Sequence, residues 1–182
     1  MSQPQVKATK NYAPEPTEEG GVREFLAFVV ASETYALPLS CIREIMRVPS
    51  VTPVPRAQRE VLGIISVRGQ VTTLIDLRQR LRVPAGPTSS RTRVLLVDQG
   101  DEIMGLLCDR VQQVHRLSEK EVELASVLGA DAASYVMGIG RPGQGERKAE
   151  STAEERADHD SEDEILILLD PIALLKRQVN HG

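Results

Sequence analysis

The longest apolar pattern of the chain lies between residues 61 and 81, where two apolar runs flank one charged turn. Residues 61–67 and 71–77 are rich in Val, Ile and Leu, a composition typical of buried strands. Gly69 permits a backbone turn that a β-carbon would obstruct. We therefore expect a β-hairpin that closes at Arg68 and Gly69.

Similar apolar runs predict strands on both sides of this hairpin. A first hairpin is expected over residues 25–39, with a turn at 32–34, followed by a helical turn and a short strand at 40–48. Further strands are expected at 93–98, 102–108, 135–139 and 165–169, with a turn at 99–101. Short helical segments are expected at 56–60, after Asp76, after Ser118 as a capping box, and after Asp170-Pro171.

An internal repeat relates residues 36–47 to residues 105–116, because their apolar positions recur at one constant offset. Two such short matches can also arise by chance among strands rich in Leu and Val. If the repeat is real, the chain holds two small β-barrels, an arrangement that disposes of exposed sheet edges. The cleft between them would then be the natural place for a partner.

Polar segments bound the apolar region. Residues 1–21 are rich in Pro, Glu and Thr, and residues 141–163 are highly charged, so we expect a disordered tail and a flexible acidic insertion. The chain has 26 acidic and 22 basic residues. Nine of the acidic and four of the basic residues lie between Arg141 and Glu164, which leaves 17 acidic and 18 basic residues elsewhere. The folded part is thus nearly neutral, and only 3% of residues are aromatic, so nucleic-acid binding is not expected.

The chain lacks an apolar segment of the length that a signal peptide or a bilayer span requires, so a cytoplasmic protein is expected. Cys41 and Cys108 have no CxxC spacing and are expected to be buried structural thiols. No pair of histidines has metal-ligand spacing, and His115 is expected to be a half-exposed strand residue. No cofactor is indicated.

Catalytic motifs are weak. Gly138–Gly143 matches the letters GxGxxG, but a proline and an acidic loop follow instead of a helix, so a nucleotide site at residues 138–145 is a minor alternative. No serine or cysteine is visibly teamed with a histidine and an acid, so we do not expect an enzyme. Arg68 is either an exposed turn residue or the partner of Glu44 in a partly buried ion pair.

Six segments of the chain carry a family resemblance: YALPL at 35–39, IREI at 42–45, TPVP at 52–55, VLGIISVRGQVTTLIDLR at 61–78, MGLLCDRVQQV at 104–114 and ILILLD at 165–170. In their order and spacing they resemble the coupling proteins of bacterial chemotaxis, the CheW-like adaptor family, and the resemblance extends from Arg23 to Arg177. The block around Gly63, Arg68-Gly69 and 76–78 is the most specific part, whereas Ser66 stands where many members have Asn. The long acidic insertion is also unusual.

The resemblance implies a mainly β fold of two SH3-like five-stranded β-barrel subdomains with short helices and a C-terminal helix, the CheW-like fold. The domain would cover about residues 22–177. Its first barrel would cover about 22–84 plus the C-terminal helix, its second about 85–170 with the insertion at 141–163, and residues 178–182 would be disordered.

The resemblance also implies a noncatalytic adaptor that joins the cytoplasmic tip of a chemoreceptor, a methyl-accepting chemotaxis protein, to the regulatory domain of a CheA-type histidine kinase. Neither nucleic acid nor direct membrane insertion is expected. The cleft between the two barrels should accept the amphipathic tip of a receptor helical hairpin. An alternative is a structural array protein that packs with kinase regulatory domains without receptor contact. By position, receptor or kinase contact is expected at Ile42, Glu44, Gly63, Arg68, Gly69, Val111 and Val114.

Overall fold

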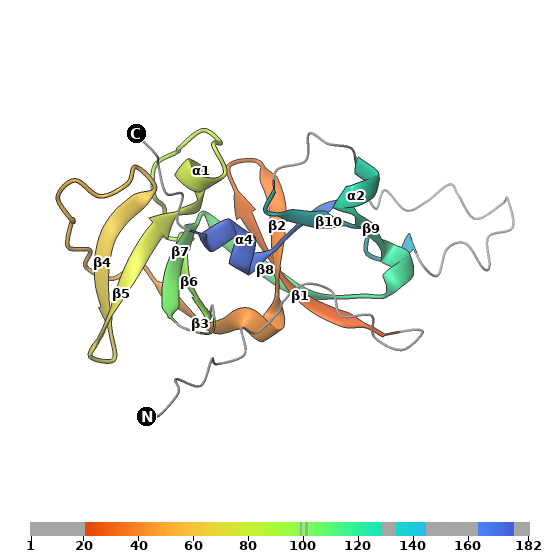
Figure 1. Ribbon diagram of the computed structural model, residues 1–182, viewed down its shortest axis with the longest axis horizontal. Helices are drawn as coiled ribbons and strands as arrows, with labels where there is room; N and C mark the ends of the chain where they lie inside the picture. Colours follow the sequence, from red (N-terminus) through yellow and green to blue (C-terminus); the bar gives the residue numbers. More distant parts are fainter. Residues whose placement is uncertain (1–20, 99, 101, 129–133, 145–163, 177–182) are drawn as a thin grey trace, which may run out of the picture.

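The computed structural model describes residues 21–98, 100, 102–128, 134–144 and 164–176. These residues form eleven strands in two sheets, together with short helical segments. The two sheets lie side by side along the long axis of the molecule (Figure 1). Nearly all of the expected tail and acidic insertion, residues 178–182, and two residues of the expected turn at 99–101 lie outside the described residues.

The larger sheet contains six strands in the order β8-β1-β2-β11-β10-β9. Strands β2 and β11 run parallel, and the other neighbours are antiparallel. Its strands are β1 (Arg23–Val30), β2 (Glu33–Pro38), β8 (Arg110–Leu117), β9 (Val122–Leu124), β10 (Val136–Gly140) and β11 (Leu166–Leu169).

The smaller sheet contains five strands in the order β3-β6-β7-β5-β4. Strands β5 and β7 run parallel, and the other neighbours are antiparallel. Its strands are β3 (Ile42–Arg47), β4 (Val61–Val67), β5 (Gln70–Asp76), β6 (Arg93–Asp98) and β7 (Ile103–Cys108). The hairpin expected at Arg68 and Gly69 is confirmed, because both turn residues have positive φ angles between β4 and β5.

The two segments of the internal repeat occupy corresponding places in the two sheets. The β1–β2 hairpin belongs to the six-stranded sheet, but the strand that follows it, β3, joins the five-stranded sheet. The β6–β7 hairpin belongs to the five-stranded sheet, but the strand that follows it, β8, joins the six-stranded sheet. Because the third strands are exchanged, the sheets do not divide the chain near residue 84. One sheet also has six strands instead of the expected five.

The repeat extends to the helices. Strand β5 ends at Asp76, whose side chain accepts a hydrogen bond from the Arg78 amide and caps α1 (Leu77–Arg80). Strand β11 is followed by Asp170, which caps α4 (Pro171–Leu175) in the same way, as its sequence predicts. The capping box that begins at Ser118 is also confirmed. The remaining short helices described are η1 (Leu39–Cys41), η2 (Glu119–Glu121) and α2 (Ala125–Leu128).

No helix forms at 56–60, where the expected helical turn is wrong: this segment consists of turns, and Arg56 has a φ of 60°. A left-handed residue at this point prevents the repeated αR conformation that a helix needs.

The apolar core has three clusters. One lies within the six-stranded sheet around Phe25 and Leu117, and one within the five-stranded sheet around Leu74 and Leu107. The third, here called the inter-sheet cluster, joins both sheets to α1 and α4. It comprises Leu26, Phe28, Val30, Tyr35, Leu37, Cys41, Ile75, Leu77, Leu81, Leu95, Val97, Met104, Leu106, Cys108, Leu169, Leu174 and Leu175.

Candidate functional site

The exchanged strands β3 and β8 present apolar side chains to the same cluster. Ile42 on β3 and Val111 on β8 are partly buried against the inter-sheet cluster. Paired residues of neighbouring strands point to the same face of a sheet. Val114 pairs with Leu26, a member of the cluster, and Ile45 pairs with Leu95, another member.

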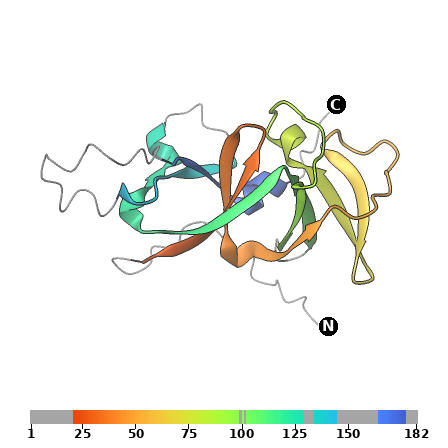
Figure 2. The ribbon, with the colours of Figure 1, turned by 180° about the vertical axis from the view of Figure 1, so that it is seen from behind.

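We call these four side chains, Ile42, Ile45, Val111 and Val114, the seam. Ile45 and Val114 are 42% and 44% exposed, so the seam reaches solvent at the edge of the inter-sheet cluster. Strands β3 and β8 are each the terminal strand of their sheet, and both lie on the near side of the molecule in Figure 2. Three of the seven predicted contact residues, Ile42, Val111 and Val114, therefore lie on the strand faces that meet the inter-sheet cluster.

The predicted ion pair between Glu44 and Arg68 is present. Nη2 of Arg68 lies 3.0 Å from Oε2 of Glu44, which connects β3 to the tip of the β4–β5 hairpin. The Arg68 side chain is 81% exposed and the Glu44 side chain 37% exposed, so the pair is more exposed than expected. Such pairs contribute about 0–1 kcal/mol, which makes the contact a positional restraint on the hairpin.

This ion pair does not border the seam. A register shift separates Ile42 from Glu44 on β3, and Glu44 pairs with Leu96, a member of the cluster inside the five-stranded sheet. The Glu44 side chain therefore lies on the face of β3 that packs inside the five-stranded sheet. The predicted residues form two separate groups: the seam, and the group of Glu44, Gly63, Arg68 and Gly69 around the β4–β5 hairpin.

Gly63 is required by its local packing. Its φ is 151°, and a β-carbon there would lie 2.3 Å from the carbonyl oxygen of Thr52. The close approach lets Thr52 and Ile64 exchange two backbone hydrogen bonds of 2.9 Å. Gly69, by contrast, has open space around it and a φ of 82°. Gly63 thus holds the loop before β4 against the hairpin, whatever partner binds there.

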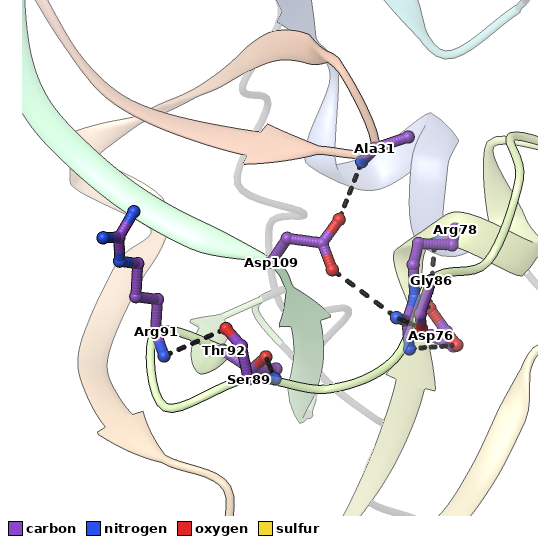
Figure 3. Close-up of polar contacts among 8 residues, drawn as sticks. All are labelled: Ala31, Asp76, Arg78, Gly86, Ser89, Arg91, Thr92 and Asp109. Atoms are coloured by element: carbon purple, nitrogen blue, oxygen red, sulfur yellow. Dashed lines mark hydrogen bonds and ion pairs between the residues drawn. The ribbon is translucent and has the colours of Figure 1, made fainter.

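A buried polar network lies where β7 passes into β8 (Figure 3). The Arg78 guanidinium donates to both carboxylate oxygens of Asp76, at 2.9 and 3.0 Å, and to the Gly86 carbonyl at 2.5 Å. The hydrogen bonds to Asp76 raise the pKa of the Arg78 guanidinium above its ordinary value. Asp109 accepts from the Ala31 amide at 2.7 Å and from Arg78 at 3.5 Å. Asp109 therefore ties the β1–β2 turn to α1, which contains Arg78.

Asp109 was not predicted to have a role. It directly precedes the crossing strand β8, and the Ala31 that it contacts has a φ of 57°. The letters around 76–78 and Asp109 belong to the segments that resemble the family, but their spacing alone does not reveal a contact across 31 positions of the chain. Arg80 of α1 was missed in the same way: it donates to the carbonyls of Leu174 and Lys176 at 2.6 and 2.9 Å and anchors α4.

Cys41, Cys108 and His115 are all buried. Cys41 and Cys108 are buried and unpaired as thiols, and burial raises the pKa of each to about 12. His115 is 8% exposed, so the half-exposed position expected for it is wrong; it pairs with Phe25, and its side chain shares the inner face of β8 with Leu117. Within the described residues, no group of three or more His, Cys, Asp and Glu could hold a metal ion.

A hollow of about 1400 Å³ lies apart from the predicted site. It is bordered by the beginning of β1, by η1, by the end of β8 and by η2. None of the seven predicted contact residues is among the described residues that line it. No described helix is both long enough and apolar enough to cross a membrane.

Comparison with known proteins decides the family. The model of the CheW-like domain matches residues 24–179. The chain belongs to this family. It is 31% identical to the chemotaxis protein CheW of Helicobacter pylori over 137 residues, which cover 75% of this chain and 82% of that protein.

More distant relatives agree with this assignment. Protein FrzA of Myxococcus xanthus is 28% identical over 118 residues, 64% of this chain and 73% of that protein. The crystal structure of the scaffolding protein TtCheW from Thermoanaerobacter tengcongensis matches with a TM-score of 0.67 at 22% identity, covering 86% of this chain and 94% of that one. This likeness shows that the CheW-like fold is present.

Proposed function

We propose that this CheW-like protein is a noncatalytic chemotaxis adaptor, which couples the cytoplasmic tip of a chemoreceptor to the regulatory domain of a CheA-type histidine kinase. Its family membership and its relatives that are named chemotaxis proteins support the pathway. The seam is the observation that carries the proposal, because it offers an exposed apolar surface built by both sheets. The protein acts in the cytoplasm and needs no cofactor.

The seam is the proposed receptor surface. Ile42 and Val111 form its partly buried floor, and Ile45 and Val114 form its exposed part. An amphipathic helix binds such a surface by placing its apolar stripe over the floor, and each Å² of apolar area removed from water contributes about 25 cal/mol. A receptor hairpin tip meets this requirement, because it presents helices with one apolar face.

The outer face of the β4–β5 hairpin is the proposed kinase surface. Val71 is 74% exposed and Leu62 37% exposed, and both lie on strands of the small sheet's edge hairpin. Exposed apolar side chains gathered on one ribbon are typical of a protein interface. Gly63 and the pair of Glu44 with Arg68 hold this ribbon in place. A β-domain of the same fold can pack on such a surface.

Reconstitution tests the proposal. Membranes that contain a chemoreceptor are mixed with a CheA-type kinase and labelled ATP, with and without this protein, and kinase phosphorylation is measured. The proposal predicts that receptor ligands change the phosphorylation rate only when the protein is present. Equal rates with and without it would contradict the adaptor role. Binding to the kinase without any binding to receptors would instead support the alternative of a structural array protein.

A further inference from the structure

Four arginines gather beside the seam. Arg47 at the end of β3 pairs directly with Arg93 at the start of β6. Arg93 in turn pairs with Cys108 at the end of β7, and Arg110 follows Cys108 by two residues at the start of β8. Arg91 precedes Arg93 by two residues. We call Arg47, Arg91, Arg93 and Arg110 the arginine cluster.

The arginine cluster has no acidic partner within the described residues. The side chains of Arg47, Arg91 and Arg110 are exposed, and none of them makes an ion pair or hydrogen bond there. In Figure 3 the Arg91 guanidinium meets none of the other labelled side chains. Arg93 is half-buried, and its Nη1 donates to the Ser90 and Thr92 carbonyls, both at 2.8 Å.

The acid nearest in sequence does not neutralise the cluster. Asp109 lies directly before Arg110, but its two oxygens accept from the Ala31 amide and from Arg78. Like charges placed opposite each other on neighbouring strands destabilise a sheet. The pairing of Arg47 with Arg93 is therefore unfavourable in the isolated protein and becomes favourable when an anion binds.

The surroundings of the cluster indicate what this anion is. Ile45 and Val48 flank Arg47 on the chain and are 42% and 39% exposed, and Val114 lies farther along the strand that begins with Arg110. Arginine beside exposed apolar side chains is typical of protein interfaces. Nucleic-acid surfaces instead interleave basic residues with aromatic rings, and only 3% of this chain is aromatic.

We propose that the arginine cluster binds carboxylates on the flank of the helical segment that docks on the seam. This inference rests on the proposed function and adds the chemistry of the partner: an amphipathic helix whose apolar stripe is bordered by Asp or Glu. Guanidinium groups bind carboxylates through paired hydrogen bonds, so the cluster fixes the orientation of the helix on the seam.

Equilibrium binding of a purified chemoreceptor cytoplasmic fragment tests the inference. The unmodified protein is compared with Arg47→Gln, Arg110→Gln and the control Arg59→Gln at about 50 and 300 mM salt. Arg59 is likewise exposed and without a described side-chain partner, so the control removes the same charge from another loop. We expect about a three- to tenfold loss of affinity for each cluster variant at low salt, a smaller loss at high salt, and no change for Arg59→Gln.

The outcomes separate this inference from the proposed function. If the fragment binds all four proteins equally, the arginine cluster is not part of the surface, and the adaptor role still stands. If the fragment does not bind the unmodified protein at all, the proposed function fails and the inference fails with it. Tighter binding by Arg47→Gln would show that Arg47 opposes binding of the fragment, and would also overturn the inference.

Discussion

Arg68 and Glu44 are joined by an ion pair of 3.0 Å that connects the tip of the β4–β5 hairpin to β3, the strand at the opposite edge of the same sheet. Because Arg68 is 81% exposed, we expect Arg68→Glu to change the free energy of unfolding by less than about 1 kcal/mol. The displaced hairpin tip should nevertheless weaken receptor-dependent control of the kinase. Urea unfolding and the phosphorylation assay measure the two effects, and the exchange Glu44→Arg with Arg68→Glu should restore control.

Gly63 should tolerate no side chain. In Gly63→Ala the new β-carbon would approach the Thr52 oxygen to 2.3 Å, so the loop must move and its two hydrogen bonds with Ile64 are lost. We expect a loss of about 3 kcal/mol in unfolding free energy, measured by urea denaturation. Gly69→Ala is the matched control: it also has a positive φ but open surroundings, and should cost about 1 kcal/mol. Equal losses would contradict the role of the Thr52 contact.

Asp109 should stabilise the junction between the sheets. Asp109→Ala leaves the Ala31 amide without its acceptor and removes a carboxylate from Arg78, and we expect a loss of about 2 kcal/mol. Arg78→Met should cost more, about 3–5 kcal/mol, because Asp76 is only 6% exposed and would keep an unpaired charge. Thermal unfolding of both variants measures the order. A larger loss for Asp109→Ala would contradict the network as described.

Glu121 should make stability depend on pH. Burial opposes its ionisation, but hydrogen bonds from the Ser118 amide and hydroxyl and from the Gly143 amide outweigh it and lower the pKa of Glu121. A carboxyl group with a lowered pKa stabilises the fold at neutral pH, and this stabilisation is lost as the pH falls through its folded-state pKa.

Glu121→Gln should therefore be less stable than the unmodified protein at pH 7, and the difference should shrink toward about pH 3. Urea denaturation at both values measures it. Glu119→Gln serves as the control, because Glu119 is exposed and its side chain makes no described hydrogen bond. If the stability difference between Glu121→Gln and the unmodified protein were the same at low pH as at pH 7, the stabilising role assigned to the ionised Glu121 carboxylate would be contradicted.

Local patterns predicted the strands well, because a run such as 61–67 can bury its apolar side chains only as part of a sheet. The turn at Gly69 and the caps at Asp76 and Asp170 were likewise predictable, since each depends on neighbours in the chain. The helical turn expected at 56–60 does not form, because the loop before β4 packs on Gly63, a contact that the local sequence does not show.

The exchange of β3 and β8 could not be read from the sequence. The repeat of residues 36–47 in residues 105–116 shows that the two segments are alike. It does not show which sheet the third strand of each segment joins, because both sheets have an edge to which that strand can pair. The same exchange explains the divided site: Ile42 and Glu44 are two residues apart, yet the register shift between them turns one toward the inter-sheet cluster and the other toward the hairpin.

The most direct test of two separate docking surfaces is a binding measurement with both partners. A chemoreceptor cytoplasmic fragment and a kinase regulatory domain are each titrated against Val114→Asp and Val71→Asp, after circular dichroism has shown that both variants are folded. We predict that Val114→Asp loses the receptor fragment and keeps the kinase domain, and that Val71→Asp does the reverse. Unchanged receptor binding by folded Val114→Asp would contradict the central claim that the seam between β3 and β8 holds the receptor.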